Sequence, residues 1–210
     1  MSKEPILLLG AGGHAKVCID VIEQSRCFTI AGLVGTAEQV GSQMLGYPVL
    51  GVDTQLPVLR KKYTNALVSI GQIKSPALRM RLFMLLEENN FGLPSVISPL
   101  SYVSPHATIG AGTIVMHGVI VSAGVVVGRN CILNSRALIE HDTIIGDHCH
   151  ISTAATLNGG VRVDGETFIG SGTVIRESIH IGARCVIGMG QHITTDCHED
   201  TKVKIAKEQS

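Results

Sequence analysis

An aliphatic residue recurs at every sixth position through almost half of the chain. From Val103 to Ile193, sixteen consecutive positions at this spacing hold Val, Ile or Leu. A period of six fits neither the 3.6-residue period of a helix face nor the two-residue alternation of a half-buried strand. It is typical of a hexapeptide solenoid, in which short parallel strands stack with their aliphatic side chains inward. The sequence therefore predicts a parallel β-helix over residues 98–194.

Three hexads make one triangular coil of 18 residues, so residues 18 apart should stack at roughly the 4.8 Å spacing of neighbouring strands. Two positions before each aliphatic residue the side chain is mostly small, which suits a second inward position. Cys131, Cys149 and Cys185 share this position, and we expect them to form a buried column rather than a redox or metal site. Directly after the aliphatic residue glycine is frequent, and we expect a left-handed backbone there, at tight corners.

The composition excludes several classes of function. The chain has no Trp, three Tyr and four Phe, which suits a narrow interior filled by aliphatic side chains. Its formal net charge is zero and no run of Lys or Arg occurs, which argues against a nucleic-acid partner. The apolar run at residues 6–9 is too short for a signal peptide or a membrane span. We therefore expect a cytosolic (cytoplasmic) protein with reduced cysteines.

The first part of the chain follows a different pattern. Apolar runs at residues 6–9, 29–34 and 66–70 alternate with helical patterns at residues 16–24 and 75–89. Strands that alternate with helices predict a small Rossmann-like α/β domain with a parallel sheet, over residues 1–97. No low-complexity linker follows it, so we expect the two domains to pack closely. Residues 195–210 lie beyond the repeat and are expected to be a polar tail.

A glycine-rich segment, Gly10-Ala11-Gly12-Gly13-His14-Ala15, follows the first predicted strand and opens the first predicted helix. Backbone N–H groups and the helix N-terminus favour a phosphate or diphosphate at such a turn. A dinucleotide site would also need an acidic residue about 20 positions later, to bind a ribose. The second strand ends in Gly32-Leu33-Val34-Gly35 instead. The segment therefore favours a nucleotide sugar over NAD, and the alternative is a tight turn that binds nothing.

One histidine of nine has a distinctive setting. His141 falls two residues after Ile139, at a corner where its ring can project outward, and it is flanked by Glu140 and Asp142. A carboxylate bonded to one ring nitrogen orients the other nitrogen as a base. The position one coil later is Gly159, which leaves room above the ring and a backbone N–H for a developing oxyanion. The alternative for such a histidine is an inert polar residue on the surface.

A metal site is a second interpretation of this region. His141, His148 and His150 together could supply the three histidines of a catalytic zinc site. Their spacings do not show that the three side chains converge. We therefore expect no metal, and a zinc-dependent hydratase is the alternative from another functional class.

The chain resembles a known family at several motifs: Gly10–Lys16, Tyr47–Gly51, Ser69–Gly71, the Glu140-His141-Asp142 segment and Leu157–Gly160. The family is that of the sialic acid O-acetyltransferase-like sugar acetyltransferases of the hexapeptide-repeat class, which includes N-acetyltransferases of nucleotide-linked amino sugars. The resemblance implies a left-handed β-helix, a homotrimer, acetyl-CoA bound between adjacent subunits, and an acceptor held by the N-terminal domain.

The resemblance also implies residue roles. It makes His141 the general base and Asp142 the residue that orients it. The coenzyme contacts that we expect are His150, Gly159, Ser171 and Met189, and the expected substrate contacts are Gly12, Gly13, His14 and Gly71. The chain differs from family members that use UDP-sugars at Val34-Gly35, where those members often carry an Asp-Asp pair. It also has Lys202–Lys207 where many hexapeptide acetyltransferases have Gly-Val-Pro-Ala-Lys.

The expected function is acetyl-CoA-dependent N-acetylation of a nucleotide-linked amino sugar, by direct transfer, as in surface glycan biosynthesis. O-acetylation of a sialic-acid-like sugar is an alternative that a histidine base would serve equally well. A non-catalytic solenoid scaffold is a further alternative, and the His-acid pair and the glycine loop argue against it.

Overall fold

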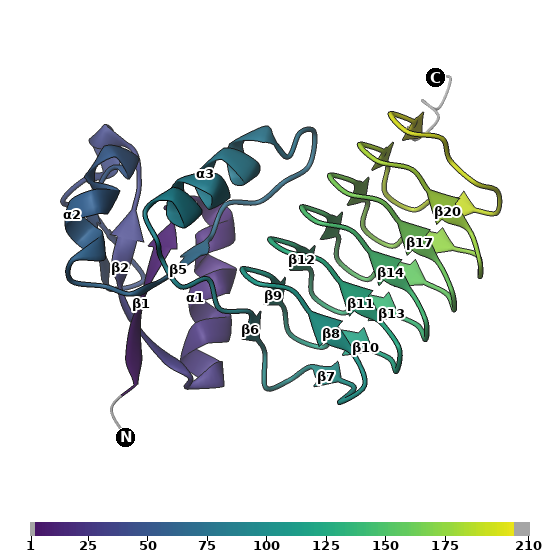
Figure 1. Cartoon of the computed structure of the whole chain (residues 1–210), viewed down its shortest axis with the longest axis horizontal. Helices are drawn as coiled ribbons and strands as arrows, with labels where there is room; N and C mark the ends of the chain where they lie inside the picture. The colour runs from purple at the N-terminus through teal and green to yellow at the C-terminus, as the bar shows by residue number, and fades with distance from the viewer. Residues whose placement is uncertain (1–2, 204–210) are drawn as a thin grey trace, which may run out of the picture.

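The structure is a computed structural model that describes residues 3–203. An α/β domain packs against one side of a long solenoid (Figure 1). The predicted combination of a Rossmann-like domain and a β-helix is confirmed. No helix among residues 3–203 is long and apolar enough to cross a bilayer.

The N-terminal domain is built on a five-stranded sheet with the order β3-β4-β2-β1-β5. Its strands are β1 (Glu4–Leu9), β2 (Phe28–Val34), β3 (Gln43–Met44), β4 (Tyr47–Gly51) and β5 (Asn65–Val68). All neighbouring pairs are parallel except β3 with β4, so the sheet is mixed. The helices are α1 (Gly13–Ser25), α2 (Leu56–Arg60) and α3 (Ala77–Glu88), with the 3₁₀ turns η1 (Ala37–Gln39) and η2 (Asp53–Gln55). Helix α1 lies between this sheet and the first strand of the solenoid (Figure 1).

Three parallel sheets of two-residue strands form the left-handed β-helix. Sheet I contains β6 (Val96–Ile97), β9 (Ile114–Val115), β12 (Ile132–Leu133), β15 (His150–Ile151), β18 (Phe168–Ile169), β21 (Val186–Ile187) and β23 (Lys202–Val203). Sheet II contains β7 (Tyr102–Val103), β10 (Ile120–Val121), β13 (Leu138–Ile139), β16 (Thr156–Leu157), β19 (Val174–Ile175) and β22 (His192–Ile193). Sheet III contains β8 (Thr108–Ile109), β11 (Val126–Val127), β14 (Ile144–Ile145), β17 (Arg162–Val163) and β20 (His180–Ile181). Paired residues are 18 apart along the chain in nearly every case, as the repeat predicts.

The interior of the solenoid follows the predicted inward positions. Ile139, Ile151 and Ile175 are fully buried, and so are the three cysteines of the predicted column. The small inward threonines have a further role that their size alone does not indicate. The Thr167 hydroxyl donates to the Gly182 carbonyl and accepts from the Cys185 N–H, at 3.0 and 3.1 Å. Such contacts satisfy backbone groups of the next coil that water cannot reach.

The predicted reason for the corner glycines is wrong. At most corners a left-handed residue lies three positions after the aliphatic residue, and it is often not glycine, as at Asn130, Arg136 and Asp142. The glycines directly after the aliphatic residue are not left-handed. They allow close approach of neighbouring coils, because a Cβ on Gly110 would lie 2.5 Å from the Gly128 carbonyl carbon.

The solenoid extends slightly beyond the expected range of 98–194. Strand β6, just before residue 98, already pairs with β9. Strand β23, inside the segment expected to be a tail, pairs with β21. The remainder of that segment, residues 204–210, lies outside the described residues.

Candidate active site

The corner that joins sheets II and III carries an exposed histidine beside an aspartate. The His141 and Asp142 side chains, between β13 and β14, are 68% and 74% exposed. The Asp142 carboxylate lies 3.0 Å from His141 Nδ1. Because a carboxylate only accepts hydrogen bonds, Nδ1 carries the proton and the Nε2 lone pair is left to accept another. Glu140, the other flanking acid, instead accepts from the Ser122 hydroxyl.

Glycines above and below leave the space that this pair fills. Gly159, one coil later, lies against the imidazole ring, since a Cβ there would be 2.5 Å from His141 Nε2. Gly124, one coil earlier, lies against Asp142, since a Cβ there would be 2.5 Å from Oδ1. Within residues 3–203 the Gly159 N–H donates no hydrogen bond. A free backbone donor therefore lies beside the basic nitrogen, as an oxyanion site requires.

The glycine loop opens α1 as predicted, and two of its residues border open space. No side chain caps α1, and a Cβ on Gly12 or Gly13 would meet nothing within 4 Å. Next to them, Gly71 lies against His14, with 3.7 Å from a Cβ on Gly71 to the nearest His14 atom. The four expected substrate contacts therefore gather around the uncapped N-terminus of α1, where an anion is stabilised.

His14 is held as a neutral imidazole. Burial, with smaller contributions from the charges of Arg79 and His150, lowers its pKa to about 3. Its Nε2 atom is buried without a hydrogen-bond partner among the described residues. A neutral ring at this place can donate or accept one hydrogen bond without adding charge beside a phosphate.

His150 points outward from sheet I, as the repeat predicts, but the N-terminal domain covers it. The residue is 4% exposed, its Nδ1 donates to the Gln72 carbonyl, and its Nε2 lies 3.1 Å from Asn134 Nδ2. Its ring packs edge-on against Phe168 at 5.2 Å between centroids and lies 6.5 Å from the His14 ring. Burial lowers the pKa of His150 to about 4, although the bond to Gln72 acts in the opposite direction. The structure thus brings His14 and His150 together.

The other two expected coenzyme contacts lie on a different corner, between sheets I and II. Ser171 bonds Ser152 through the two hydroxyls at 2.9 Å. Met189 stacks one coil above Ser171, because the Gly190 N–H donates to the Ser171 carbonyl, and its side chain is 61% exposed. These two residues are accessible to a ligand that runs along the solenoid, and their contact with acetyl-CoA stays a prediction.

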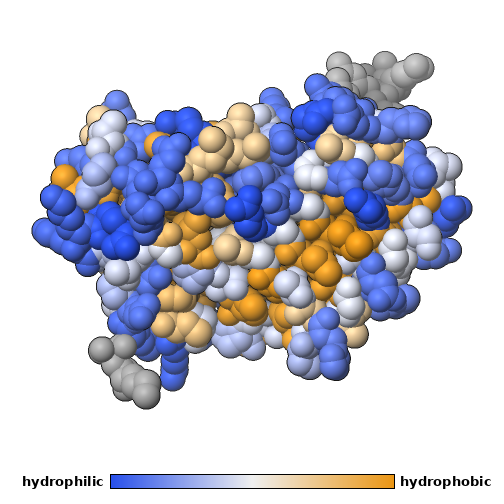
Figure 2. Space-filling view, viewed as in Figure 1, coloured by the Kyte–Doolittle hydropathy of each residue, from blue (hydrophilic) through white to orange (hydrophobic). Residues whose placement is uncertain are grey.

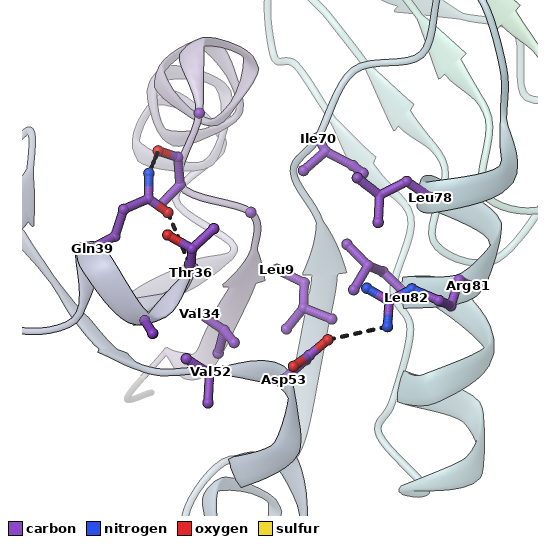
Figure 3. Close-up of a pocket in the computed structure, with 15 residues that line it drawn as sticks. Leu9, Val34, Thr36, Gln39, Val52, Asp53, Ile70, Leu78, Arg81 and Leu82 are labelled. Carbon is purple, nitrogen blue, oxygen red and sulfur yellow. Dashed lines mark hydrogen bonds and ion pairs between the residues drawn. The ribbon is translucent and has the colours of Figure 1, made fainter.

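A pocket of about 540 Å³ lies at the carboxyl ends of the N-terminal strands (Figure 3). Its wall is mostly apolar and includes Leu9, Val34, Val52, Ile70, Leu78 and Leu82. Asp53 and Arg81 are the two charged residues in the lining. They form an ion pair with 3.2 Å between Arg81 Nη1 and Asp53 Oδ2, drawn as a dashed line in Figure 3. Gln39 braces the pocket by bonding the Ala11 carbonyl and the Thr36 N–H. The expected substrate contact Gly12 lines this pocket.

Sequence reasoning missed Asp53 and Arg81, because neither belongs to a motif and only the fold brings the two together. It also missed the buried Arg79, for which a signal exists. Arg79, Leu82, Phe83 and Leu86 recur at the spacing of one helix face, and all four are buried.

The three histidines of the zinc alternative do not converge within one chain. His141 lies at the corner between sheets II and III, whereas His148 and His150 face the N-terminal domain across the solenoid. His148 bonds Asn130 and packs against Phe83. Among residues 3–203, no cluster of three potential metal ligands occurs.

Residues 5–86 match the model of the PglD N-terminal domain. The chain is also similar to perosamine N-acetyltransferase from Caulobacter crescentus, whose H141N variant was solved in complex with CoA and GDP-perosamine. That match has 31% identity, covers 98% of this chain and 96% of that one, and has a TM-score of 0.91. The H141A variant was solved with the same two ligands.

Two further structures agree in fold. The acetyltransferase domain of PglB from Neisseria gonorrhoeae, solved with acetyl coenzyme A, shares 28% identity over 97% of both chains, with a TM-score of 0.88. WeeI from Acinetobacter baumannii shares 22% identity over 98% of both chains, with a TM-score of 0.84, and supports the fold alone. With its PglD-type N-terminal domain, its hexapeptide solenoid and these relatives, the chain belongs to the hexapeptide-repeat sugar N-acetyltransferases.

Proposed function

We propose that this protein transfers an acetyl group from acetyl-CoA to the amino group of a nucleotide-linked sugar, with His141 as the general base. The observation that carries the proposal is the His141–Asp142 pair, seated at an exposed corner between Gly124 and Gly159. The relative from C. crescentus supports it, because that enzyme is a perosamine N-acetyltransferase and its histidine at the same chain number was replaced in two of its solved structures.

In this reaction the sugar nitrogen attacks the carbonyl carbon of the thioester. His141 Nε2 takes the proton that the amine loses, and the Asp142 carboxylate stabilises the resulting imidazolium. The Gly159 N–H donates to the oxyanion of the tetrahedral intermediate. When the carbon–sulfur bond breaks, the imidazolium returns the proton to the CoA thiolate. The products are an amide and CoA, and no covalent enzyme intermediate is needed.

A His141→Ala variant tests this role. We expect it to bind acetyl-CoA normally and to lose roughly 100-fold or more in kcat, the range of a general base. His106→Ala is the matched control, because His106 lies exposed on the same edge of the solenoid and should leave kcat unchanged. Turnover by His141→Ala near the wild-type rate would remove His141 from the role of base. Transfer to hydroxyl groups alone, in a panel of sugars, would favour the O-acetyltransferase alternative.

The proposed site needs a second copy of the chain. The N-terminal domain covers sheet I, whereas His141 lies at the opposite corner. Sheets II and III expose apolar residues, namely Tyr102, Ile120, Val126, Ile144 and Val174, and Figure 2 shows an apolar band along the solenoid. Surfaces of this kind mark protein interfaces. We propose a homotrimer in which His141 of one subunit serves the acceptor held by its neighbour, with acetyl-CoA between them.

Subunit mixing tests this arrangement. Gly12→Asp places a carboxylate where we expect a phosphate, so it should abolish acceptor binding while leaving His141 intact. When this variant and His141→Ala are unfolded and refolded together, shared sites restore part of the activity that each lacks alone. Activity that never returns on mixing, or a stable monomer in sedimentation, would contradict the shared site.

We further propose that the nucleotide carries guanine. Asp53 and Arg81 are the charged groups of the pocket, and the apolar wall suits the faces of a base. Guanine presents two adjacent donors that match a carboxylate, and its O6 and N7 acceptors match a guanidinium. Uracil and adenine lack the paired donors. GDP-perosamine, bound by the relative from C. crescentus, is a ligand of this class.

Calorimetric titration with GDP, UDP and ADP tests the base preference without turnover. We expect wild-type protein to bind GDP most tightly, and Asp53→Asn to weaken GDP binding by roughly 10- to 100-fold, the worth of a bidentate base contact. Binding of UDP should change little in this variant. Tighter binding of UDP than of GDP by the wild type would overturn the assignment of guanine and leave the role of His141 untouched.

A further inference from the structure

A cation is buried where the two domains meet. Arg79, in α3, is 1% exposed. Its Nη1 donates to the Val68 and Ile70 carbonyls at 2.8 Å each, and its Nε donates to the Asn130 carbonyl at 3.2 Å. Val68 ends β5, Ile70 follows it by two residues, and Asn130 forms a corner of the solenoid. One guanidinium therefore ties the N-terminal sheet to the β-helix through three backbone carbonyls.

No carboxylate pairs with this charge among the described residues. Burial lowers the pKa of Arg79 to about 10, so the group still carries its charge at neutral pH. A buried cation without an acid is expensive, and well-packed apolar residues would join two domains at lower free energy. Three carbonyl contacts that converge on one guanidinium also fix the position of one domain relative to the other, which apolar packing alone does not do.

Neighbouring polar residues continue the connection. Gln72 Nε2 donates to the His148 carbonyl at 2.8 Å, and the Gln72 carbonyl accepts from His150 Nδ1. Asn130 Nδ2 lies 3.0 Å from His148 Nδ1. We call Gln72, Arg79, Asn130, His148 and His150 the interdomain seam. It joins the end of β5 and the segment that follows it, on both sides of Gly71, to two coils of the solenoid.

The seam is incompletely satisfied. The buried side-chain atoms without a partner in the described part of the chain are Arg79 Nη2, Gln72 Oε1, Asn130 Oδ1 and His14 Nε2. Three of the four belong to the seam, and His14 lies beside it. Unpaired buried polar atoms destabilise a fold, and in native proteins they mark positions kept for another reason.

That reason lies in the two histidines that the seam holds together. His14 belongs to the acceptor domain and His150 to the solenoid, with 6.5 Å between their ring centroids. Arg79 bonds Ile70 on the side of the acceptor domain and Asn130 on the side of the solenoid. It is remote from the His141 corner, and although Ile70 lines the base pocket, Arg79 itself does not. Burial is the main reason that both histidines are neutral, and the charge of Arg79 adds to it.

We propose that Arg79 is a positioning residue for the acceptor: its guanidinium fixes the end of β5 on the solenoid and so sets where His14 and Gly71 stand relative to His150. The proposal rests on the proposed function for one point, the identity of the acceptor. The contacts that Arg79 makes do not depend on that function. When His14 and Gly71 are no longer held where the acceptor meets them, the acceptor loses binding contacts, so the cost falls on KM.

Steady-state kinetics at saturating acetyl-CoA tests this role. Arg79→Lys keeps the charge but cannot reach three carbonyls. We expect it to raise KM for the nucleotide sugar by roughly 10- to 100-fold, the worth of one or two lost hydrogen bonds to a charged acceptor, with kcat and acetyl-CoA affinity within about twofold of wild type. Arg60→Met is the matched control, because Arg60 Nε also donates to a backbone carbonyl, that of Asn90, but entirely within the N-terminal domain. A wild-type KM in Arg79→Lys, or a loss confined to kcat, would overturn the proposal.

Titration of the histidine ring protons by NMR provides a readout without turnover. In Arg79→Met, which removes the charge, His14 and His150 should protonate at higher pH than in Arg79→Lys. Identical titrations in the two variants would contradict the electrostatic part of the proposal. If wild-type protein acetylates no amino-sugar nucleotide, the proposed function fails, whereas nucleotide binding and these titrations still decide the role of Arg79. If Arg79→Met does not fold, Arg79→Gln, which also removes the charge, takes its place in the titration, and the kinetics of Arg79→Lys still decide the positioning role.

Discussion

Asp142 shows how one residue serves the backbone and the chemistry at once. It occupies the left-handed position of its corner, with φ at 59°, and Asp is among the few non-glycine residues that tolerate this conformation. That conformation directs its carboxylate to His141 Nδ1. Gly124 and Gly159 then leave the pair the space that side chains would otherwise fill.

Replacing Asp142 with Asn should separate these two roles. Asn also tolerates the left-handed conformation, so folding and acetyl-CoA binding should be unchanged. The loss of negative charge removes the stabilisation of the imidazolium, and we expect kcat to fall roughly 10- to 100-fold. Stopped assays at saturating substrates measure the effect. Adding Asp142→Asn to His141→Ala should cause no further loss, and an additive loss would show that Asp142 acts independently of the histidine.

Replacing Gly159 with Ala should disturb the base directly. The backbone of Gly159 is not left-handed, so alanine is tolerated, but its Cβ would lie 2.5 Å from His141 Nε2. The ring must rotate away, and we expect kcat to fall roughly 100-fold with little change in melting temperature. In the background of His141→Ala the same substitution should have no effect on kcat. A full-rate Gly159→Ala enzyme would contradict the contact between this glycine and the base.

At the scale of the element, the hexad predicts the solenoid but not what surrounds it. The period alone indicates the inward residues, the stacking at 18 residues and the outward direction of His141, because these depend on local geometry. It does not indicate that the N-terminal domain covers sheet I, because three faces of a hexapeptide coil look alike in sequence. The burial of His150 under Gln72 therefore could not be predicted from the repeat.

The inward threonines provide a test of the solenoid itself. Thr167→Val keeps the shape of the side chain but leaves the Gly182 carbonyl and the Cys185 N–H without their partner. We expect the free energy of unfolding to fall by roughly 2–4 kcal/mol, for two buried groups left unsatisfied. Thr167→Ser, which retains the hydroxyl, should cost only about 1 kcal/mol. Urea denaturation measures both, and a larger loss in Thr167→Ser would show that the methyl group dominates.

At the scale of the whole molecule, the contact between the domains should be sensitive to acid. The pKa values of His14 and His150 are about 3 and 4, below the ordinary value of 6.5. Below about pH 6.5 these two histidines therefore bind protons in the unfolded chain but not in the folded chain. Stability should fall between about pH 6.5 and pH 4, by up to roughly 1.4 kcal/mol per pH unit for each histidine.

Urea denaturation at several pH values across this window measures the slope. His14→Gln should reduce it, because one of the two sites no longer titrates. His192→Gln, at an exposed position on sheet II, is the matched control and should leave it unchanged. Equal slopes in all three proteins would show that His14 is not responsible.

The 18-residue coil also limits how such an enzyme can vary. Insertion or deletion of a whole coil preserves every inward residue and every strand pair. A change of another length shifts aliphatic side chains out of register unless a corner absorbs it, as in the last coil, where Val186 pairs with Lys202. Each whole coil moves the His141 corner along the solenoid axis by about 4.8 Å relative to the N-terminal domain. The distance between the base and the acceptor domain is therefore most readily changed in steps of one coil, and we expect relatives that serve longer or shorter acceptors to differ by whole coils.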